Sequence, residues 1–600
     1  MQRLADYVIN RLIEKNINTI FLVTGRGLLY LSDAVARSKD IASVSTFHEQ
    51  GASYAALAYA SVTGSMGACL VSTGCGSTNA LTGLLCAWQD NIPVIFISGQ
   101  HMLTETTRFT GLPIRTYGSQ EADIISLVEP ITKYAVMITD PLSIGYELDK
   151  AIHLANTKRK GPVWIDIPLD IQDMRIEPEN LERFLPDDED CKANELGILV
   201  SDVASGLKES TRPIILVGGG VRSAGANEEL KRFAEKNRIP VVFSQSACDT
   251  YGLANELSIG AVGSLGGSRA GNFAVQNADY VLVIGSKLCS QTIGADFSTF
   301  ARNAHITVVD IDEIEHKKTG SRIDTLVISD AKVFLDELNK YSIRYNGNGW
   351  VDKCQHWKEL FSVSRESFIS KNTVHGRLDL YWFSSDLSNR IPDDATVITD
   401  AGFEQLIVPS SMRFSTKQRC LFPAAQGAMG YAIPAIVGAH YGGSKSIITI
   451  VGDGSIMMNI QELLTIAYHG IPAKIFIINN NMYAIIRKRQ LDLFRNRTIG
   501  NDPSDGVAAP DFRKIADSYG IPYSLIQNEQ EYCENIDEIL DYPGLCICEV
   551  LCIEDQKYLH TSYSINKHKK LVRSPLENLS PFIDRERFLS EMIVEPIDQD

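Results

Sequence analysis

Two apolar runs in the last third of the chain end in polar clusters, and this pattern constrains the fold more than any other feature. Residues 446–451 run directly into Gly452-Asp453-Gly454-Ser455, and residues 473–478 are followed directly by three asparagines, residues 479–481. Short apolar runs bounded by turn residues are typical of buried parallel strands. We therefore expect two neighbouring strands of an α/β sheet, joined by a helix over residues 459–468.

Asp453 and Asn480 follow these two runs and lie 27 residues apart. Parallel α/β sheets place their ligand sites at the carboxyl ends of the strands. Carboxylate and amide oxygens suit Mg²⁺, and glycine-rich backbone at the start of a helix suits a phosphate. An ordinary βαβ crossover with a polar turn explains Gly-Asp-Gly alone, but it does not explain the asparagines at the second strand end. Together the two features predict a site for a metal-bound phosphate.

Strand and helix patterns alternate along three stretches of the chain. We predict three doubly wound parallel α/β domains at residues 1–175, 195–340 and 374–555, followed by a tail at 556–600 that is expected to be only partly ordered. An acidic, proline-bearing linker at 170–194 and a polar connector at 341–373 separate them. The three domains have similar size and similar strand–helix period, which is consistent with an ancestral duplication, although periodicity alone does not establish one.

Composition excludes several classes of partner. The formal charge is −16, whereas a surface that follows nucleic acid or binds an anionic bilayer needs a basic excess. No apolar run reaches transmembrane length, and residues 1–13 are typical of an amphipathic helix rather than of a signal peptide. The twelve cysteines show no Cys-x-x-Cys spacing, which indicates reduced thiols. We expect a cytoplasmic protein.

Polar clusters also follow strand-like runs near the N-terminus, at residues 24–27, 48–50, 72–79 and 99–100. Each has a plain structural explanation. A glutamate such as Glu49 after a strand is usually a solvated helix-cap residue, the glycines at 72–79 suit an ordinary turn, and Met429 suits a core position. The residues alone leave these alternatives open.

The cluster Gly452–Ser455 with Asn479-Asn480 resembles the signature of thiamine-diphosphate enzymes, and residues 457–463 are similar to the acetolactate synthase branch of that family. The resemblance covers residues 1–555 and implies pyrimidine-binding, central and diphosphate-binding domains in that order. It implies Mg²⁺ held by Asp453, Asn480 and the main-chain carbonyl of Met482. It also implies that Gly452, Gly454 and Ser455 hold the diphosphate of thiamine diphosphate.

Residues 47–52 resemble the activating-glutamate motif of the family. The resemblance implies that Glu49 drives the pyrimidine ring into the imino tautomer, a task for a carboxylic acid in an apolar site. The loop 72–80 resembles the loop over the pyrimidine, with Cys75 in place of a proline, and implies contacts from Gly74 and Asn79. Residues 118–123 resemble a Phe-Gln-Glu segment, so Gln120 is expected to face the substrate.

Residues 426–430 resemble a turn whose methionine wedges between the two rings of the cofactor. The resemblance gives this role to Met429, whose thioether fills irregular gaps. It also implies that the main-chain carbonyl of Gly427 receives the 4′-amino group.

Three departures from the acetolactate synthase pattern stand at the expected site. Arg26 replaces a glycine beside the reaction centre, Arg489 replaces the tryptophan that selects the acceptor, and Phe403-Glu404-Gln405 replaces a Gln-His-Gln that touches the diphosphate. The alternative is that these three departures are neutral substitutions at the surface. Two added guanidinium groups nevertheless favour an anionic acceptor that is bulkier than a small keto acid.

Three segments of the central domain resemble FAD-binding segments, at residues 217–221, 263–267 and 309–312. The expected Arg-Phe-Asp-Asp-Arg is replaced by Lys287–Gln291, which loses two arginines. A single glycine-rich segment is a weak signal. FAD therefore stays possible, and the lost arginines count against it.

The resemblance implies an enzyme that decarboxylates a 2-oxo acid, with pyruvate expected, and ligates the resulting acyl carbanion to a carbonyl acceptor such as an anionic sugar. The alternatives are acetolactate synthase proper, a simple 2-oxo acid decarboxylase, and a catalytically silent cofactor-binding regulatory subunit. The presence of Glu49 together with Asp453 and Asn480 counts against the silent protein. In the family Glu49 of one subunit meets Asp453 of another, so a homodimer or homotetramer is expected.

Overall fold

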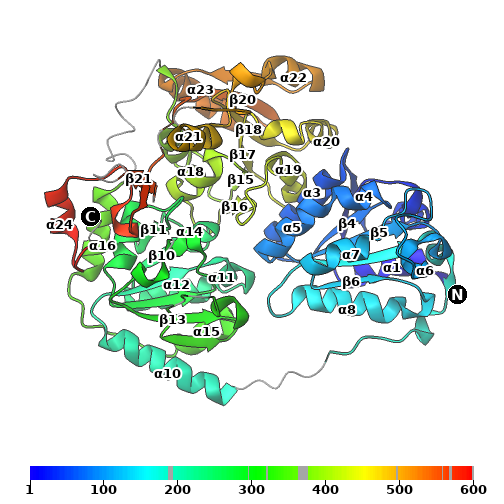
Figure 1. The fold of residues 1–600 in the computed structure, drawn as a ribbon, viewed down its shortest axis with the longest axis horizontal. Helices are drawn as coiled ribbons and strands as arrows, with labels where there is room; N and C mark the ends of the chain where they lie inside the picture. Colours follow the sequence, from blue (N-terminus) through cyan, green and yellow to red (C-terminus); the bar gives the residue numbers. More distant parts are fainter. Residues whose placement is uncertain are drawn as a thin grey trace.

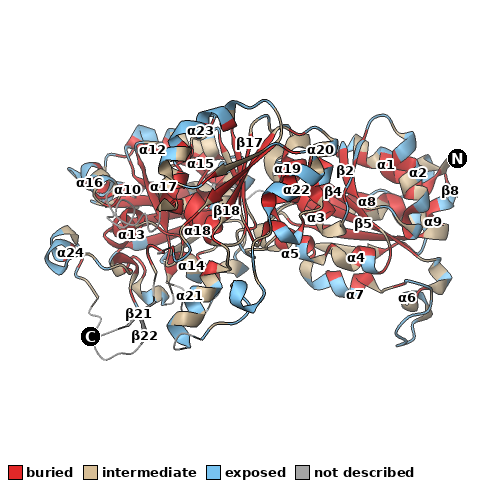
Figure 2. Ribbon diagram, turned by 90° about the horizontal axis from the view of Figure 1, so that it is seen from above, coloured by how far each residue is buried: buried red, intermediate tan, exposed pale blue. Residues whose placement is uncertain are grey.

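Three six-stranded parallel sheets form the framework of the protein, seen here in a computed structural model (Figure 1). The structure describes residues 1–186, 193–294, 296–318, 320, 322–362, 376–494, 497–556, 558–561, 563–565 and 571–597. Helices cover both faces of each sheet, and the strands form the buried centre of each layer (Figure 2). The predicted fold class is confirmed. None of the described helices is long and apolar enough to cross a bilayer.

The N-terminal sheet has the strand order β3-β2-β4-β5-β7-β6. Its strands are nearly continuous apolar runs, as expected where helices cover both faces. The strands are β2 (Thr19–Leu22), β3 (Ala42–Ser45), β4 (Gly67–Val71), β5 (Val94–Gln100), β6 (Tyr134–Met137) and β7 (Val163–Pro168). The helices are α1 (Leu4–Glu14), α2 (Leu29–Arg37), α3 (Glu49–Thr63), α4 (Cys75–Asn79), α5 (Leu81–Asp90), α6 (Thr107–Thr110), α7 (Ile124–Val128), α8 (Ile144–Asn156) and α9 (Leu169–Asp173). A short antiparallel pair joins β1 (Gln2–Arg3) to β8 (Arg175–Ile176).

The C-terminal sheet has the order β16-β15-β17-β18-β20-β19. The strands are β15 (Thr396–Thr399), β16 (Arg419–Leu421), β17 (Ile447–Gly452), β18 (Ala473–Asn479), β19 (Tyr523–Ile526) and β20 (Cys546–Leu551). The helices are α17 (Leu380–Leu387), α18 (Phe403–Ser411), α19 (Ala432–Tyr441), α20 (Glu462–Tyr468), α21 (Ala484–Leu493), α22 (Phe512–Tyr519) and α23 (Glu529–Asp541). The predicted neighbours β17 and β18 pair in parallel. The helix between them starts at Glu462, later than expected, because residues 456–458 form a 3₁₀ turn.

The central sheet follows a different order, β11-β10-β9-β12-β13-β14. Its strands are β9 (Pro213–Val217), β10 (Val241–Ser244), β11 (Ser258–Val262), β12 (Tyr280–Ile284), β13 (His305–Asp310) and β14 (Thr325–Ile328). Its helices are α10 (Ala193–Glu209), α11 (Gly219–Ser223), α12 (Asn227–Asn237), α13 (Arg269–Gln276), α14 (Ser290–Ile293) and α15 (Ala331–Leu338). Counted within each domain, the outer two sheets share the order 2-1-3-4-6-5, whereas the central sheet has the dinucleotide-binding order 3-2-1-4-5-6. A duplication is therefore supported for the first and third domains only.

The first and third domains pack through α3 and α19. Helix α3 is rich in alanine and buried over most of its length, which suits a helix enclosed by other elements. Small residues let the two backbones approach closely. A Cβ added at Gly438 of α19 would lie 2.0 Å from the carbonyl oxygen of Ala55 in α3.

The C-terminal tail packs on the central domain. Glu577 is fully buried and accepts hydrogen bonds from Gln276 (2.6 Å) and Arg302 (2.8 Å), and Phe588 of α24 (Arg585–Glu591) packs edge-on against Phe273. The described part is thus more ordered than its charge and proline content predicts. The connector at 341–373 contains α16 (Trp350–Leu360), and residues 187–192 and 363–375 of the two connecting segments lie outside the described residues.

Candidate active site

Asp453 and Asn480 meet at the carboxyl edge of the C-terminal sheet, as predicted. One carboxylate oxygen of Asp453 accepts hydrogen bonds from the backbone N–H groups of Asn480 (3.1 Å) and Asn481 (2.6 Å). The side-chain oxygen of Asn480 accepts from the N–H of Met482 (3.3 Å). Asn481 adopts the left-handed conformation, φ = 58°, which turns the chain back toward Asp453.

The Asp453 carboxyl is suited to a cation. Burial raises its pKa to about 6, and the N–H groups of Asn481, Gly454 and Asn480 only partly oppose this. A buried carboxylate without a compensating side-chain charge is stabilised by a bound metal ion. Among the described residues no cluster of three or more histidine, cysteine or acidic side chains forms a metal site. Amide, carbonyl and phosphate oxygens beside this carboxylate would make up the ligand set that Mg²⁺ prefers.

Two glycine turns close around the same edge. The hydroxyl of Ser455 accepts from the N–H of Gly430 (2.9 Å), which ties the turn of Met429 to the one that bears Asp453. Gly427 has φ = 57°, and a Cβ there would lie 2.8 Å from the side-chain oxygen of Gln405. A Cβ at Gly454 would lie 2.1 Å from the Tyr483 ring, so both positions need glycine.

Two further acids lie beside this edge: Glu404, known from the sequence only as a departure from the family pattern, and Asp400, which the sequence analysis did not single out. Glu404, at the start of α18, is buried, and its carboxyl lies 3.4 Å from where a Cβ of Gly452 would stand. Burial, reinforced by the charges of Asp453 and Asp400, raises the pKa of Glu404 to about 8. Burial also raises the pKa of Asp400 to about 7, and one of its oxygens lacks a hydrogen-bond partner. In its protonated form Glu404 adds no charge against a diphosphate and can donate a hydrogen bond.

Glu49 and Asn79 meet at the corresponding edge of the N-terminal sheet. The amide of Asn79, at the end of α4, donates to the Glu49 carboxylate (2.9 Å). Glu49 is the first residue of α3, which His48 caps by accepting from the N–H of Gln50 (3.1 Å). A Cβ at Gly76 would lie 3.3 Å from Glu49, so the loop of α4 closes over the glutamate.

Gly74 and Gln120 also lie in contact. A Cβ at Gly74 would lie 2.2 Å from the carbonyl oxygen of Gln120, and both residues have positive φ, 62° and 65°. The turn that carries Arg26 packs on the same loop, since the N–H of Gly27 donates to the hydroxyl of Ser72 (3.2 Å). Arg26 and Gln120 both have exposed side chains.

Glu462 connects the two edges within one chain. Its buried carboxylate accepts from the N–H groups of Phe47 (2.9 Å) and His48 (3.2 Å), directly before Glu49. The side chain of Asn459 donates to Gln50 (2.9 Å) and to the carbonyl of Gly430 (2.8 Å). Glu49 with Asn79 in the N-terminal domain and Asp453 with Asn480 in the C-terminal domain are the two half-sites.

Arg489 lies on α21, which begins directly after the loop of Asn480 and Met482. Its side chain is exposed, and its charge lies near Tyr558 of the tail. Its neighbour Arg487 is held by Asp502 (3.1 Å) and Asp555 (2.9 Å).

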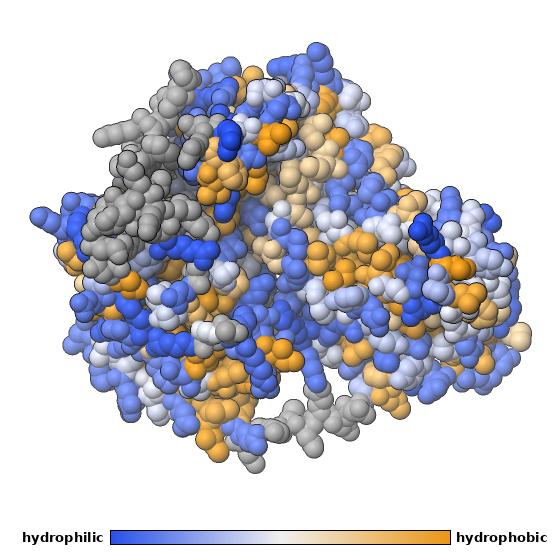
Figure 3. All heavy atoms as spheres, in the orientation of Figure 1, coloured by the Kyte–Doolittle hydropathy of each residue, from blue (hydrophilic) through white to orange (hydrophobic). Residues whose placement is uncertain are grey.

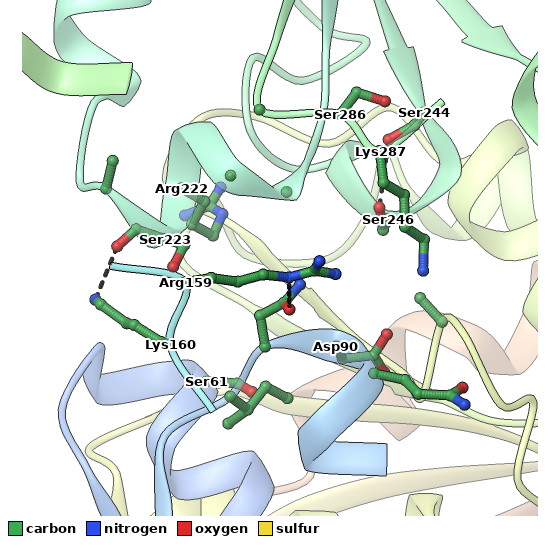
Figure 4. A pocket seen from close by; sticks show the side chains of 18 of the residues that line it. Ser61, Asp90, Arg159, Lys160, Arg222, Ser223, Ser244, Ser246, Ser286 and Lys287 are labelled. Carbon is green, nitrogen blue, oxygen red and sulfur yellow. Dashed lines mark hydrogen bonds between the residues drawn. The ribbon is translucent and has the colours of Figure 1, made fainter. Parts of the chain in front are cut away.

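A cavity of about 340 Å³ lies where the three domains converge. Figure 4 shows Lys287 pointing toward Asp90, and Arg159 extending across the space below Arg222. These arginines already have acidic partners: Arg159 pairs with Asp312 (2.9 Å) and Glu315 (2.7 Å), and Arg222 with Asp249.

The cavity does not unite the three segments that resemble FAD-binding segments. Residues of 217–221 and 309–312 line it, but residues 263–267 do not. Segment 263–267 instead contacts the tail, where His560 donates to the carbonyl of Gly267 (3.1 Å). In addition, the carboxylate of Asp312 in segment 309–312 already forms an ion pair with Arg159 (2.9 Å). This cavity therefore brings together only two of the three segments.

Family models match three parts of the chain, in the order of its sheets. The thiamine pyrophosphate enzyme N-terminal TPP binding domain matches residues 2–127, the central domain 200–338, and the C-terminal TPP binding domain 400–550. The two half-sites lie in the two TPP binding domains.

Curated relatives match nearly the whole chain. The acetolactate synthase large subunit of Lactococcus lactis is 30% identical over 92% of this chain and 93% of its own length. That of Corynebacterium glutamicum is 31% identical, over 90% and 85%. The chloroplastic acetolactate synthase of Arabidopsis thaliana is 28% identical, over 92% and 82%.

Proposed function

The chain belongs to the thiamine pyrophosphate enzyme family, and on that premise we propose that it decarboxylates pyruvate and ligates the two-carbon unit to an anionic carbonyl acceptor. The observation that carries this proposal is the pair of half-sites, Glu49 with Asn79 and Asp453 with Asn480, at matching edges of two sheets with one strand order. When bound, thiamine diphosphate supplies the electron sink that decarboxylation requires.

Each half-site has one task. Asp453, the Asn480 side chain and the Met482 carbonyl hold Mg²⁺, while Ser455 and the glycine turns present backbone N–H groups to the diphosphate. Glu49, fixed by Asn79, holds a proton at the pyrimidine ring nitrogen and activates the cofactor. Retention of both groups argues against a silent regulatory subunit.

We propose that the complete site forms between two copies of the chain. Large apolar side chains close in sequence to the half-site residues are exposed: Phe47, Met458, Leu464 and Tyr468. Figure 3 shows hydrophobic side chains at the surface of the N-terminal domain next to its junction with the C-terminal domain. A second copy can bury such surface.

The function is tested by incubating the protein with thiamine diphosphate, Mg²⁺ and pyruvate, with and without phosphorylated or nucleotide-linked sugar aldehydes and ketones. Products are identified by mass spectrometry. A ligation product that requires the sugar supports the proposal. Acetolactate alone would identify an acetolactate synthase, acetaldehyde alone a simple decarboxylase, and no turnover would contradict the enzyme activity.

Arg489 is proposed to bind the charged part of the acceptor. A guanidinium pairs with phosphate or carboxylate through two charge-assisted hydrogen bonds, which contribute about 1.5–3 kcal/mol, or roughly ten- to a hundredfold in affinity. Arg489→Trp is expected to raise the KM of the acceptor by this factor and to leave pyruvate decarboxylation nearly unchanged. Lys488→Trp, one residue earlier on the same helix, is the control. Equal loss of decarboxylation and ligation in Arg489→Trp would contradict the assignment.

We expect the purified protein to be colourless and active without added FAD, because Lys287–Gln291 replaces the segment that would supply two arginines to the flavin. The measurement is the absorption spectrum, followed by denaturation and fluorescence of any released flavin. Stoichiometric flavin, or activity that depends on added FAD, would overturn this expectation.

A further inference from the structure

A chain of buried polar side chains lies under the loop that carries Gln120. Side chains alternate along a strand, so Ser98 and Gln100 project from the same face of β5. The register of β5 with β7 places Asp166 opposite Ser98. The Ser98 hydroxyl donates to one oxygen of Asp166 (2.6 Å), and the Gln100 amide donates to the other (3.2 Å).

The amide of Gln100 uses all its hydrogen-bonding capacity. Its nitrogen donates to Asp166 and to the carbonyl of Ala122 (2.8 Å), and its oxygen accepts from the Thr73 hydroxyl (2.5 Å) and the His101 N–H (3.0 Å). A flipped amide would set donor against donor at the His101 N–H and acceptor against acceptor at the Ala122 carbonyl, so the orientation is unambiguous. Gln100 and Asp166 are 2% and 1% exposed, so losing a partner leaves an unsatisfied buried group.

This chain contacts the backbone of the loop at Gln120 and at Ala122. The one hydroxyl proton of Thr73 is shared by two acceptors, the Gln100 oxygen (2.5 Å) and the carbonyl oxygen of Gln120 (3.3 Å), and the Gln100 amide donates to the carbonyl of Ala122 (2.8 Å). Gln120 itself has φ = 65°, a left-handed conformation that is unfavourable for a side chain other than glycine and persists only where neighbours enforce it. Its side chain stays exposed while its backbone is held.

A carboxylate on the loop reinforces this hold. Glu121, 7% exposed, accepts from the N–H (2.9 Å) and hydroxyl (2.7 Å) of Thr107 and from the N–H of Tyr117 (3.2 Å). It therefore joins the two ends of the exposed segment 107–117 next to Gln120. Thr73 directly precedes Gly74, whose turn is expected at the pyrimidine. Thr73 therefore lies between this turn and Gln120, which is expected at the substrate.

We propose that Thr73, Gln100 and Asp166 form a positioning unit that fixes the backbone of Gln120 and thereby aims its side chain at the 2-oxo acid. The second half of this inference rests on the proposed function. The first half concerns only the chain. The three residues act through Gln120 and touch neither substrate nor the reacting atoms.

Thr73→Val tests the unit because it removes the hydroxyl and keeps the shape of the side chain. Gln100→Met, which removes the amide at similar length, is the second variant. Thr73→Ser restores the hydroxyl. Thr132→Val is the matched control, since Thr132 is equally buried in the same domain and its hydroxyl binds Val128 (3.0 Å), away from the loop.

Hydrogen exchange by mass spectrometry on the peptide that covers residues 118–123 is the first readout. Thr73→Val and Gln100→Met are expected to speed exchange there roughly three- to tenfold, whereas Thr73→Ser and Thr132→Val match wild type. The second readout is steady-state kinetics: kcat/KM for pyruvate is expected to fall by the same factor, with affinity for thiamine diphosphate changed less than twofold.

Unchanged exchange in both loss variants overturns the proposal, and so does equal acceleration in Thr132→Val, which would show general loosening of the domain. Faster exchange with unchanged kcat/KM contradicts the link to substrate. If wild-type protein turns over no 2-oxo acid, the proposed function fails, while the exchange comparison still decides whether the unit holds Gln120.

Discussion

Asp453→Ala is expected to abolish retention of thiamine diphosphate. The substitution removes the one carboxylate of the metal site and leaves the N–H groups of Asn480 and Asn481 without their acceptor. Changes in groups that merely orient metal ligands already lower metal affinity by roughly 10–100-fold, so losing a direct ligand is expected to cost on the order of a hundredfold or more. Isothermal calorimetry with thiamine diphosphate and saturating Mg²⁺ measures the loss.

Asp541→Ala is the control for this measurement, because Asp541 is an exposed aspartate at the end of α23 in the same domain. It should bind the cofactor as wild type does. Full affinity in Asp453→Ala would show that the diphosphate is held without the predicted metal site. A similar loss in both variants would point to damage of the domain rather than of the site.

The meeting of Asp453 with Asn480 could be predicted from the sequence because both follow apolar runs of adjacent strands. Parallel strands bring their carboxyl ends to one edge, so a local pattern was enough. The meeting of Glu49 with Asn79 was not accessible in this way. Each residue alone suits a cap or a turn, and only the resemblance to a family placed both in one site.

Local sequence pattern does not reveal the contacts of three buried residues, Glu404, Glu462 and Gln100. Glu462 binds backbone groups more than 400 residues earlier in the chain, and such a partner leaves no trace in spacing. Glu404 was visible only as a departure at the diphosphate, and its raised pKa follows from burial beside two other acids. Gln100 does stand at a strand's carboxyl end, which is the signal that could have indicated it.

The tail and the central sheet illustrate a second limit. Charge and proline predicted partial order for the tail, but Glu577 and Phe588 find partners in the central domain that composition cannot specify. Similar spacing of strands in all three domains did not distinguish the central strand order from the outer two. Strand order is set by which helices cover which face, and that information is not local.

Glu49→Gln is expected to keep cofactor affinity largely intact and to slow C2–H exchange of bound thiamine diphosphate by roughly a hundred- to ten-thousandfold. Glutamine retains the shape and can still bind Asn79, but it cannot transfer a proton, and a positioned acid or base contributes about this factor. Proton NMR after acid quench in D₂O measures the exchange rate. Glu129→Gln, an exposed glutamate of the same domain, should exchange as wild type.

The two inactive variants together test where the complete site forms. If Glu49 of one copy meets Asp453 of another, a dimer of Glu49→Gln with Asp453→Ala contains one site with both substitutions and one intact site. Random exchange of subunits from an equal mixture then restores about a quarter of wild-type activity, because half of the dimers are mixed and each has one working site. If both groups of a site came from the same chain, no mixture would recover activity. Unchanged C2–H exchange in Glu49→Gln alone would instead show that another group activates the cofactor.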